Sequence, residues 1–171
     1  MADLVGGRGP GVVPVTAGVA GGGVVAGAGA AGGGPPHERH DLPEPDDFTR
    51  PYWAAAAEGR LLLRRCSDCG RAHHYPREFC PFCWAGEDRV AWEPAGGSAT
   101  LYTWSVVHRN DLPPFGRQVP YTAAVVDLAE GPRMMTRVVD CPPADLRVGM
   151  PLTVAFRETA PGVWVPVFRP R

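Results

Sequence analysis

The sequence predicts a mainly β protein in which a short N-terminal helix is followed by a zinc ribbon and then by five short strands. Two Cys-x-x-Cys pairs, separated by ten residues, have a spacing typical of a tetrahedral thiolate site for zinc. Beyond residue 93, short segments rich in valine, threonine and aromatic residues alternate with Gly and Pro turns, as in small all-β domains. The 171 residues thus divide into a tail, a helical segment, a metal-binding module and a β domain.

Residues 1–36 form a Gly- and Ala-rich tail with almost no charge and no aromatic side chain. Such a segment buries too little apolar surface to offset the entropy lost on ordering, so we expect it to be disordered. Glycines interrupt its apolar runs and Arg8 is its one basic residue, so it lacks the pattern of a secretory signal or a membrane span. Together with cysteines at metal spacing, this predicts a cytoplasmic protein that does not associate with membranes.

Acidic and basic side chains nearly balance, which gives a formal net charge of −1. Proteins whose main ligand is nucleic acid usually carry a strongly basic face. The composition therefore disfavours nucleic acid as a partner. Zinc ribbons and small barrels do occur in modules that bind single-stranded nucleic acid, however, and such a module is the alternative function.

Residues 37–59 are predicted to contain a polar, proline-punctuated linker and then a short helix. Asp47 or Thr49 is expected to cap the helix, because an oxygen of such a side chain can accept hydrogen bonds from the first free amides. Pro51 falls in the first turn, where proline is tolerated. Gly59 is expected to end the helix.

Aromatic residues near the start of this helix allow two interpretations. Phe48 and Tyr52 fall on one face, as expected of an amphipathic helix that packs on its own domain. Alternatively, Phe48, Tyr52 and Trp53 form an aromatic anchor that docks onto a partner protein, because large aromatic side chains often dominate interfaces.

Residues 60–92 are predicted to form the zinc ribbon, whose expected ligands are Cys66, Cys69, Cys80 and Cys83. Four thiolates leave a zinc ion no open coordination position, so the site is expected to be structural rather than catalytic. From the residues alone, an iron site of the same geometry and a pair of disulfides remain open. His73 and His74, between the two pairs, are expected to lie on a polar hairpin face and not to replace a cysteine.

Residues 93–171 are predicted to form the β domain, with strands at residues 100–108, 121–128, 133–139, 152–156 and 163–168. Strict alternation along the first strand places Tyr102 and Trp104 on the same face. Five short strands suit a small barrel, and residues 144–150 interrupt them where an OB-type barrel carries its insertion. Periodicity alone equally permits a small sandwich.

Residues 46–170 contain a series of short motifs in a specific order. A helix with a Thr-Arg-Pro-Tyr-Trp start comes first. The motifs after it are, in sequence order, Leu62–Gly70, Tyr75–Arg77, Cys80–Cys83, Gly97–His108, Pro120–Tyr121, Val148–Met150 and Phe168–Pro170. In that order the motifs resemble the thiolase-associated family known as domain of unknown function thirty-five. The resemblance implies an N-terminal helical segment, a rubredoxin-like zinc ribbon and a five-stranded OB-fold barrel.

The resemblance also implies a non-catalytic accessory subunit. Similar proteins accompany thiolase-superfamily enzymes, which include acetyl-CoA acetyltransferases, lipid-transfer-protein-like aldolases and acyltransferases, and some accompany hotdog-fold hydratases. They bind the partner and help to form its acyl-CoA or acyl-thioester site. We therefore predict no catalytic residue here and expect Cys141, the one unpaired cysteine, to be a packed residue. An enzyme that acts alone on acyl-CoA is a third possibility.

A loop after the first barrel strand is the candidate contact with coenzyme A or with the partner. Arg109 and Arg117 flank it, and guanidinium groups suit phosphate through paired charge-assisted hydrogen bonds. Leu112 and Phe115 give the same loop an apolar surface that suits a partner protein. Alternatively, both arginines are solvated or bind local carboxylates.

Overall fold

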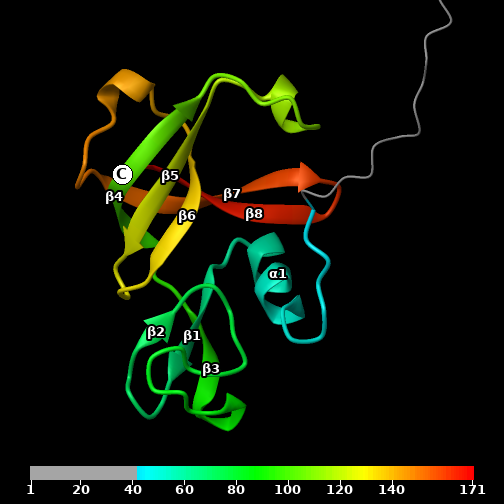
Figure 1. The fold of residues 1–171 in the computed structure, drawn as a ribbon, viewed down its shortest axis with the longest axis vertical. Helices are drawn as coiled ribbons and strands as arrows, with labels where there is room; N and C mark the ends of the chain where they lie inside the picture. The colour runs from blue at the N-terminus through cyan, green and yellow to red at the C-terminus, as the bar shows by residue number, and fades with distance from the viewer. Residues whose placement is uncertain (1–41) are drawn as a thin grey trace, which may run out of the picture. The chain divides into compact units, whose positions relative to one another are not determined.

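The computed structural model describes residues 42–171, and the predicted disordered tail at residues 1–36 lies outside them. Figure 1 shows one α-helix, a small sheet and a barrel. The helix is α1 (Arg50–Ala57), and the small sheet contains β1 (Leu62–Cys66), β2 (Ala72–His73) and β3 (Val90–Pro94). The barrel contains β4 (Ser98–Val107), β5 (Tyr121–Leu128), β6 (Arg133–Val138), β7 (Pro151–Ala160) and β8 (Val163–Pro170). This mainly β architecture confirms the predicted fold class.

The turn before α1 is held by Asp46, and not by the expected side-chain cap from Asp47 or Thr49. The Asp46 carboxylate accepts hydrogen bonds from both the amide and the hydroxyl of Thr49, each at 2.6 Å. Thr49 itself makes no capping hydrogen bond with its side chain. The helix itself begins at Arg50, with Thr49 at its N-cap position, and it ends as expected before Gly59, which has a left-handed backbone.

The small sheet places β1 between its two neighbours, in the order β2-β1-β3, and both pairings are antiparallel. Leu62 and Leu63 are buried at the start of β1. On the adjoining strand, the Glu93 carboxylate accepts a hydrogen bond from the Arg65 guanidinium at 2.9 Å. β1 is therefore paired on both sides where it leads into the cysteine site.

The five remaining strands close into a barrel with the order β4-β5-β6-β8-β7. All pairings are antiparallel except that of β6 with β8, which is parallel and joins Val138 to Phe168. A short 3-10 turn at residues 143–145 lies between β6 and β7, as the sequence predicts for an OB fold. Leu101, Leu152 and Phe168 are fully buried in the barrel. The closed order excludes the alternative sandwich.

Tyr102 and Trp104 differ from the expectation that they share a face. The pairing of β4 with β5 shifts register between Leu101 and Thr103, which is a β-bulge. Leu101 and Trp104 pack toward the core, whereas Tyr102 is exposed. The Tyr102 ring instead lies 3.5 Å from the Arg133 guanidinium carbon. The two rings do not form the stacking platform that the nucleic-acid hypothesis requires.

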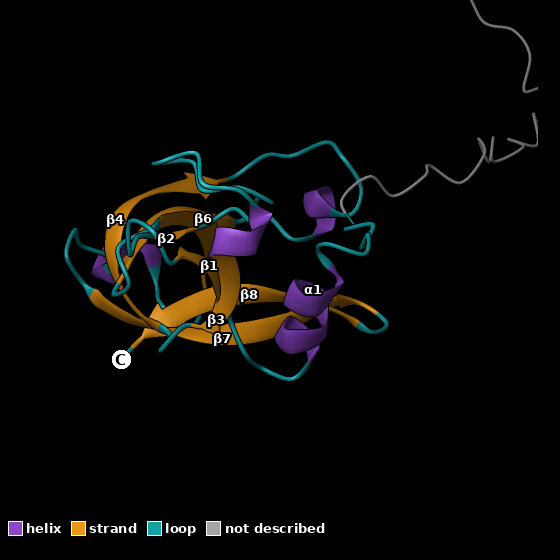
Figure 2. Ribbon diagram, turned by 90° about the horizontal axis from the view of Figure 1, so that it is seen from below, coloured by secondary structure: helices purple, strands orange, loops and turns teal. Residues whose placement is uncertain are grey.

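The helix, the ribbon and the barrel share one hydrophobic core. Tyr52 and Ala55 from α1, residues 61–63 at the start of β1, and Val126 and Phe168 from the barrel belong to a single cluster of buried side chains. The view in Figure 2, turned by 90° from that of Figure 1, also shows α1 beside β8, and the two elements are in contact. Within residues 42–171, no helix combines the length and the apolar composition needed to cross a membrane.

Candidate metal centre and binding surfaces

Two turns with the same hydrogen-bond pattern present the four cysteines. In each, the amide of the first cysteine donates to the carbonyl five residues later, and the amide four residues later donates back to the carbonyl of that cysteine. These distances are 3.1 and 3.0 Å around Cys66, and 2.9 and 2.9 Å around Cys80. The fifth residue of each turn has a left-handed backbone, with φ of 71° at Gly70 and 63° at Trp84. The sequence thus folds into two matching knuckles.

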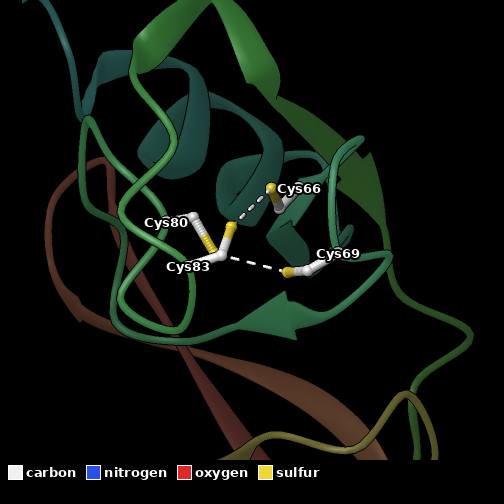
Figure 3. A group of neighbouring side chains, drawn as sticks. All are labelled: Cys66, Cys69, Cys80 and Cys83. Atoms are coloured by element: carbon white, nitrogen blue, oxygen red, sulfur yellow. Dashed lines mark hydrogen bonds between the residues drawn. The ribbon is translucent and has the colours of Figure 1, made fainter.

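The knuckles face each other so that their four sulfur atoms converge (Figure 3). Cys66 and Cys83 are 3.6 Å apart at Sγ, as are Cys69 and Cys80, and all four Sγ atoms lie within 4.8 Å of one another. A zinc–sulfur distance of about 2.3 Å in a tetrahedron requires sulfurs about 3.8 Å apart. A disulfide requires about 2.0 Å. The four predicted ligands therefore fit a zinc ion and are not paired as disulfides.

The thiols ionise unequally. Desolvation, the largest effect on Cys80, opposes its ionisation, but hydrogen bonds from the amides of Cys83 and Phe82 and from neighbouring thiols lower its pKa to about 7. The amide of Ala85 favours ionisation of Cys83, yet desolvation and the surrounding thiols raise its pKa to about 12. A bound cation displaces such protons, because metal ligation requires the thiolate form.

The aromatic residues of the predicted docking helix lie mostly against their own protein. Tyr52 is buried, with 6% of its surface exposed, and its hydroxyl is 3.4 Å from His74 Nε2. The ring centroid of Phe48 is 5.8 Å from that of Trp92. Trp53 is half-buried and packs on the core cluster. Among these residues, Trp53 and Tyr52 also line a surface pocket.

That pocket, which we call the helix–barrel pocket, lies between α1, the segment after β2, and strands β6 and β8. Its volume is about 280 Å³, and its lining is largely apolar. The lining residues are Thr49, Tyr52, Trp53, His74, Tyr75, Pro76, Met134, Met135, Val165 and Pro166. Tyr75 and Met135 are exposed at its rim, by 59% and 67%. His73 and His74 were expected to lie on a polar hairpin face, which is wrong. His73 is buried, and His74 is mostly enclosed where it lines this pocket.

The predicted coenzyme A loop, residues 109–117, is well exposed. Arg109 donates to the Asp111 carboxylate at 3.1 Å, so its charge is locally balanced. Arg117 is exposed, and Leu112 exposes 68% of its surface. Phe115 is half-buried, and its ring lies 5.5 Å from the guanidinium of Arg137. Phe115 thus brings this loop close to Arg137, an arginine that was not predicted as a site residue from the sequence.

Sequence reasoning missed Arg137 and its neighbour Arg157, which line one cleft with Cys141. They come from β6 and β7, twenty residues apart, so no spacing in the sequence connects them. Cys141 is half-buried and packs against the core, as predicted. No histidine lines this cleft within the described part of the chain.

Comparisons with known protein families match two adjacent parts of the chain. Residues 53–89 match the ChsH2 rubredoxin-like zinc ribbon domain, and this match contains all four cysteines of the metal centre. Residues 92–157 match the ChsH2 C-terminal OB-fold domain, which corresponds to the barrel through most of β7. The matches agree with zinc as the metal and with the order of the two modules.

Whole proteins and solved structures give the same result. A probable enoyl-CoA hydratase alpha subunit of Thermomonospora curvata is 35% identical over 120 residues, which cover 70% of this chain but 36% of that protein. A solved chain described as Ltp2-ChsH2(DUF35) aldolase superimposes with a TM-score of 0.65 at 33% identity, covering 75% of this chain and 98% of that one.

A DUF35 domain-containing scaffold protein of Methanocaldococcus jannaschii is 37% identical over 100 residues, which cover 57% of this chain and 68% of that protein. The zinc ribbon, the OB-fold barrel and their order are common to the family matches and to the structure described above. The chain belongs to the DUF35 family of zinc-ribbon and OB-fold proteins.

Proposed function

We propose that this chain is a non-catalytic accessory subunit that binds a thiolase-superfamily enzyme and helps to form its acyl-CoA or acyl-thioester site. The observation that carries the proposal is the similarity to the Ltp2-ChsH2(DUF35) aldolase chain, which this chain covers almost completely. The name of the Methanocaldococcus jannaschii relative, a scaffold protein, supports the same division of labour.

The rim of the helix–barrel pocket is the surface that we propose for the partner. Tyr75 and Met135 expose much of their apolar surface there, beside the partly buried Trp53. Clusters of exposed aromatic and methionine side chains are typical of protein interfaces. We propose the loop at residues 109–117 as a second contact, because Leu112 is exposed on it. In this proposal the metal acts indirectly, by fixing the ribbon that carries Tyr75.

A hydratase is the second candidate for the partner. The observation that favours it is the 35% identity to a protein named as an enoyl-CoA hydratase alpha subunit. The chain spans about a third of that protein's length, so the similarity concerns only that part of it. In this case the partner is a separate hydratase chain, and the acyl-CoA thioester is again the shared substrate.

Co-expression tests the proposal. The chain is produced together with each thiolase-superfamily enzyme and each hotdog-fold hydratase of its host, and complexes are measured by size-exclusion chromatography with light scattering. We expect one enzyme to co-elute and to gain acyl-CoA activity in the complex. Co-elution with none of them contradicts the proposal, as does turnover of acyl-CoA by the purified chain alone.

A matched pair of variants locates the contact. Met135→Glu places a charge on the rim of the helix–barrel pocket and is expected to weaken the complex by about 10-fold or more, because a buried unpaired charge is costly. Val148→Glu, on a side chain that is 72% exposed outside that pocket, is expected to leave the affinity unchanged. Equal effects of the two variants exclude the helix–barrel pocket as the interface.

A further inference from the structure

Two arginine side chains converge in a cleft beside the point where β4 ends and β5 begins. This barrel-mouth cleft has a volume of about 360 Å³. The polar residues that line it include Gln118, Tyr121, Arg137, Asp140, Cys141 and Arg157. A cleft of this size is within the range of small-ligand sites.

Arg137 is held in place by neighbours that leave its charge unneutralised. Its guanidinium carbon lies 3.8 Å from the ring centroid of Tyr121, and Nη1 donates to Gln118 Oε1 at 2.6 Å. Stacking on the ring covers a face of the guanidinium, whereas its N–H groups lie in the plane and remain directed at other acceptors. Both partners are electrically neutral, so Arg137 is positioned without a counter-charge.

Arg157 has even fewer partners. Its Nε atom is buried and has no hydrogen-bond acceptor among residues 42–171. Within the same residues, neither Arg157 nor Arg137 forms an ion pair with a carboxylate. Desolvation lowers the pKa of Arg137, and the positive charge of Arg157 lowers it further. The two guanidinium groups therefore repel each other in a partly desolvated cleft.

One carboxylate, that of Asp140, lines the same cleft. It is exposed at the edge and does not pair with either arginine. Its backbone is left-handed, with φ of 55°, which Asp and Asn tolerate better than most residues. Two positive groups and one negative group leave the cleft with a positive balance, which an anionic ligand would neutralise.

We propose that the barrel-mouth cleft binds a phosphate group between the guanidinium groups of Arg137 and Arg157. A phosphate carries up to two negative charges and several acceptor oxygens, so it can satisfy two guanidinium groups at once, which a single carboxylate does less completely. The source of the group is either free phosphate or a phosphorylated organic ligand such as coenzyme A. The proposal concerns this chain alone and does not require the partner enzyme.

Isothermal titration of the zinc-loaded chain with inorganic phosphate, pyrophosphate, coenzyme A and pantetheine tests the site. Tighter binding of coenzyme A than of phosphate, with none of pantetheine, identifies a phosphorylated ligand. Equal binding of phosphate and coenzyme A identifies free phosphate. Both results support the site, whereas no binding of any phosphate compound at millimolar concentration overturns it and leaves the partner proposal untouched.

Substitutions assign the binding to these residues. Arg137→Gln and Arg157→Gln each remove one charge and are expected to weaken binding by about 10-fold or more. Arg147→Gln, an exposed arginine outside the cleft, serves as the matched control and is expected to change nothing. Asp140→Asn removes the one negative neighbour and is expected to tighten binding by about 3-fold.

Arg137→Gln removes the stack on Tyr121 and can disturb the start of β5. Asp140→Asn then keeps the test decisive, because asparagine fits the same left-handed backbone. Binding that is unchanged in all three cleft variants contradicts the assignment.

Discussion

Gly70 and Trp84 occupy the same position in the two cysteine knuckles, and both have a left-handed backbone. Gly70 has φ of 71° and Trp84 has φ of 63°. A glycine adopts this conformation without penalty, whereas a residue with a Cβ atom pays about 1–2 kcal/mol. One knuckle is therefore relaxed and the other strained, although their hydrogen bonds match. Trp84 is 77% exposed and stacks on Phe79 with the ring planes 8° apart.

Gly70→Ala is expected to destabilise the zinc-loaded protein by about 1 kcal/mol. Apart from the adjacent residues in the chain, no atom lies within 4 Å of the Cβ that the alanine adds, so the cost is conformational and not steric. Trp84→Gly is the complementary change. It relieves the strain but loses a stack worth about 0.5–1.5 kcal/mol, so we expect little net effect. Chemical denaturation of both variants measures the difference, and an equal loss of stability in the two contradicts the strain argument.

Cys80→Ser is expected to abolish zinc binding, with bound zinc falling from about one ion per chain to none. The ribbon depends on the metal for stability, and a loss of several kcal/mol corresponds to a decrease in the melting temperature of about 10 °C or more. Cys141→Ser, outside the metal centre, is the control and should retain zinc. Elemental analysis by mass spectrometry measures the metal. Iron in place of zinc in the wild-type chain contradicts the assignment of the ion.

The stability of the fold is expected to decrease below pH 6.5 because of His74. Desolvation, and secondarily the charge of His73, lower the pKa of His74 to about 4. The pKa is about 6.5 in the unfolded chain. The neutral ring thus stabilises the fold fully above pH 6.5, and this contribution is lost as the pH falls toward 4, by up to about 3 kcal/mol.

The His74→Phe variant isolates this effect. Denaturation of both proteins at several pH values between 7 and 5, with zinc in excess, should give a smaller decrease in the variant. His108→Gln, at an exposed histidine, should behave as the wild type. If the pH dependence of His74→Phe equals that of the wild type, the acid sensitivity arises elsewhere.

Arg64→Ala is expected to destabilise the protein by about 2 kcal/mol. Arg64 is 5% exposed, and its guanidinium carbon lies 5.3 Å from the ring centroid of Phe48 and 5.0 Å from that of Trp92. The substitution removes both the packed stem and the cation–π contacts. Arg60→Ala, at an exposed arginine that pairs with Glu58, should change stability by less than about 0.5 kcal/mol. Similar values for both variants contradict a joint role of the three side chains.

The sequence predicted those parts of the molecule whose geometry is local. The spacing within each cysteine pair determines a knuckle, so the metal centre follows from residues that are neighbours in the chain. The strand segments also followed from periodicity, although β7 continues to Ala160, beyond the predicted residue 156, because its pairing with β8 extends to a tight turn. The predicted face of Tyr102 was wrong because a β-bulge interrupts the two-residue alternation of the strand. No single residue in the sequence indicates this bulge.

The barrel-mouth cleft could not be predicted from the sequence, for a different reason. Arg137 and Arg157 meet because two strands distant along the chain are brought together by closure of the barrel, and one residue of slippage would separate them. The sequence pointed to Arg109 and Arg117 instead, because these arginines flank the loop. In the structure, Phe115 from that loop and Gln118 directly after it contact Arg137.

The packing of α1 on β8 has a consequence for synthesis. The first helix of the described chain lies on its last strand, and both contribute to the shared core through Tyr52 and Phe168. A nascent chain on the ribosome can form its knuckles, capture a metal ion and pack Phe48 and Tyr52 against the ribbon early, but the side of its helix that faces the barrel stays uncovered until β8 has emerged. Until then the shared core lacks Phe168, so the synthesis of β8 is the event that joins the helix to the barrel.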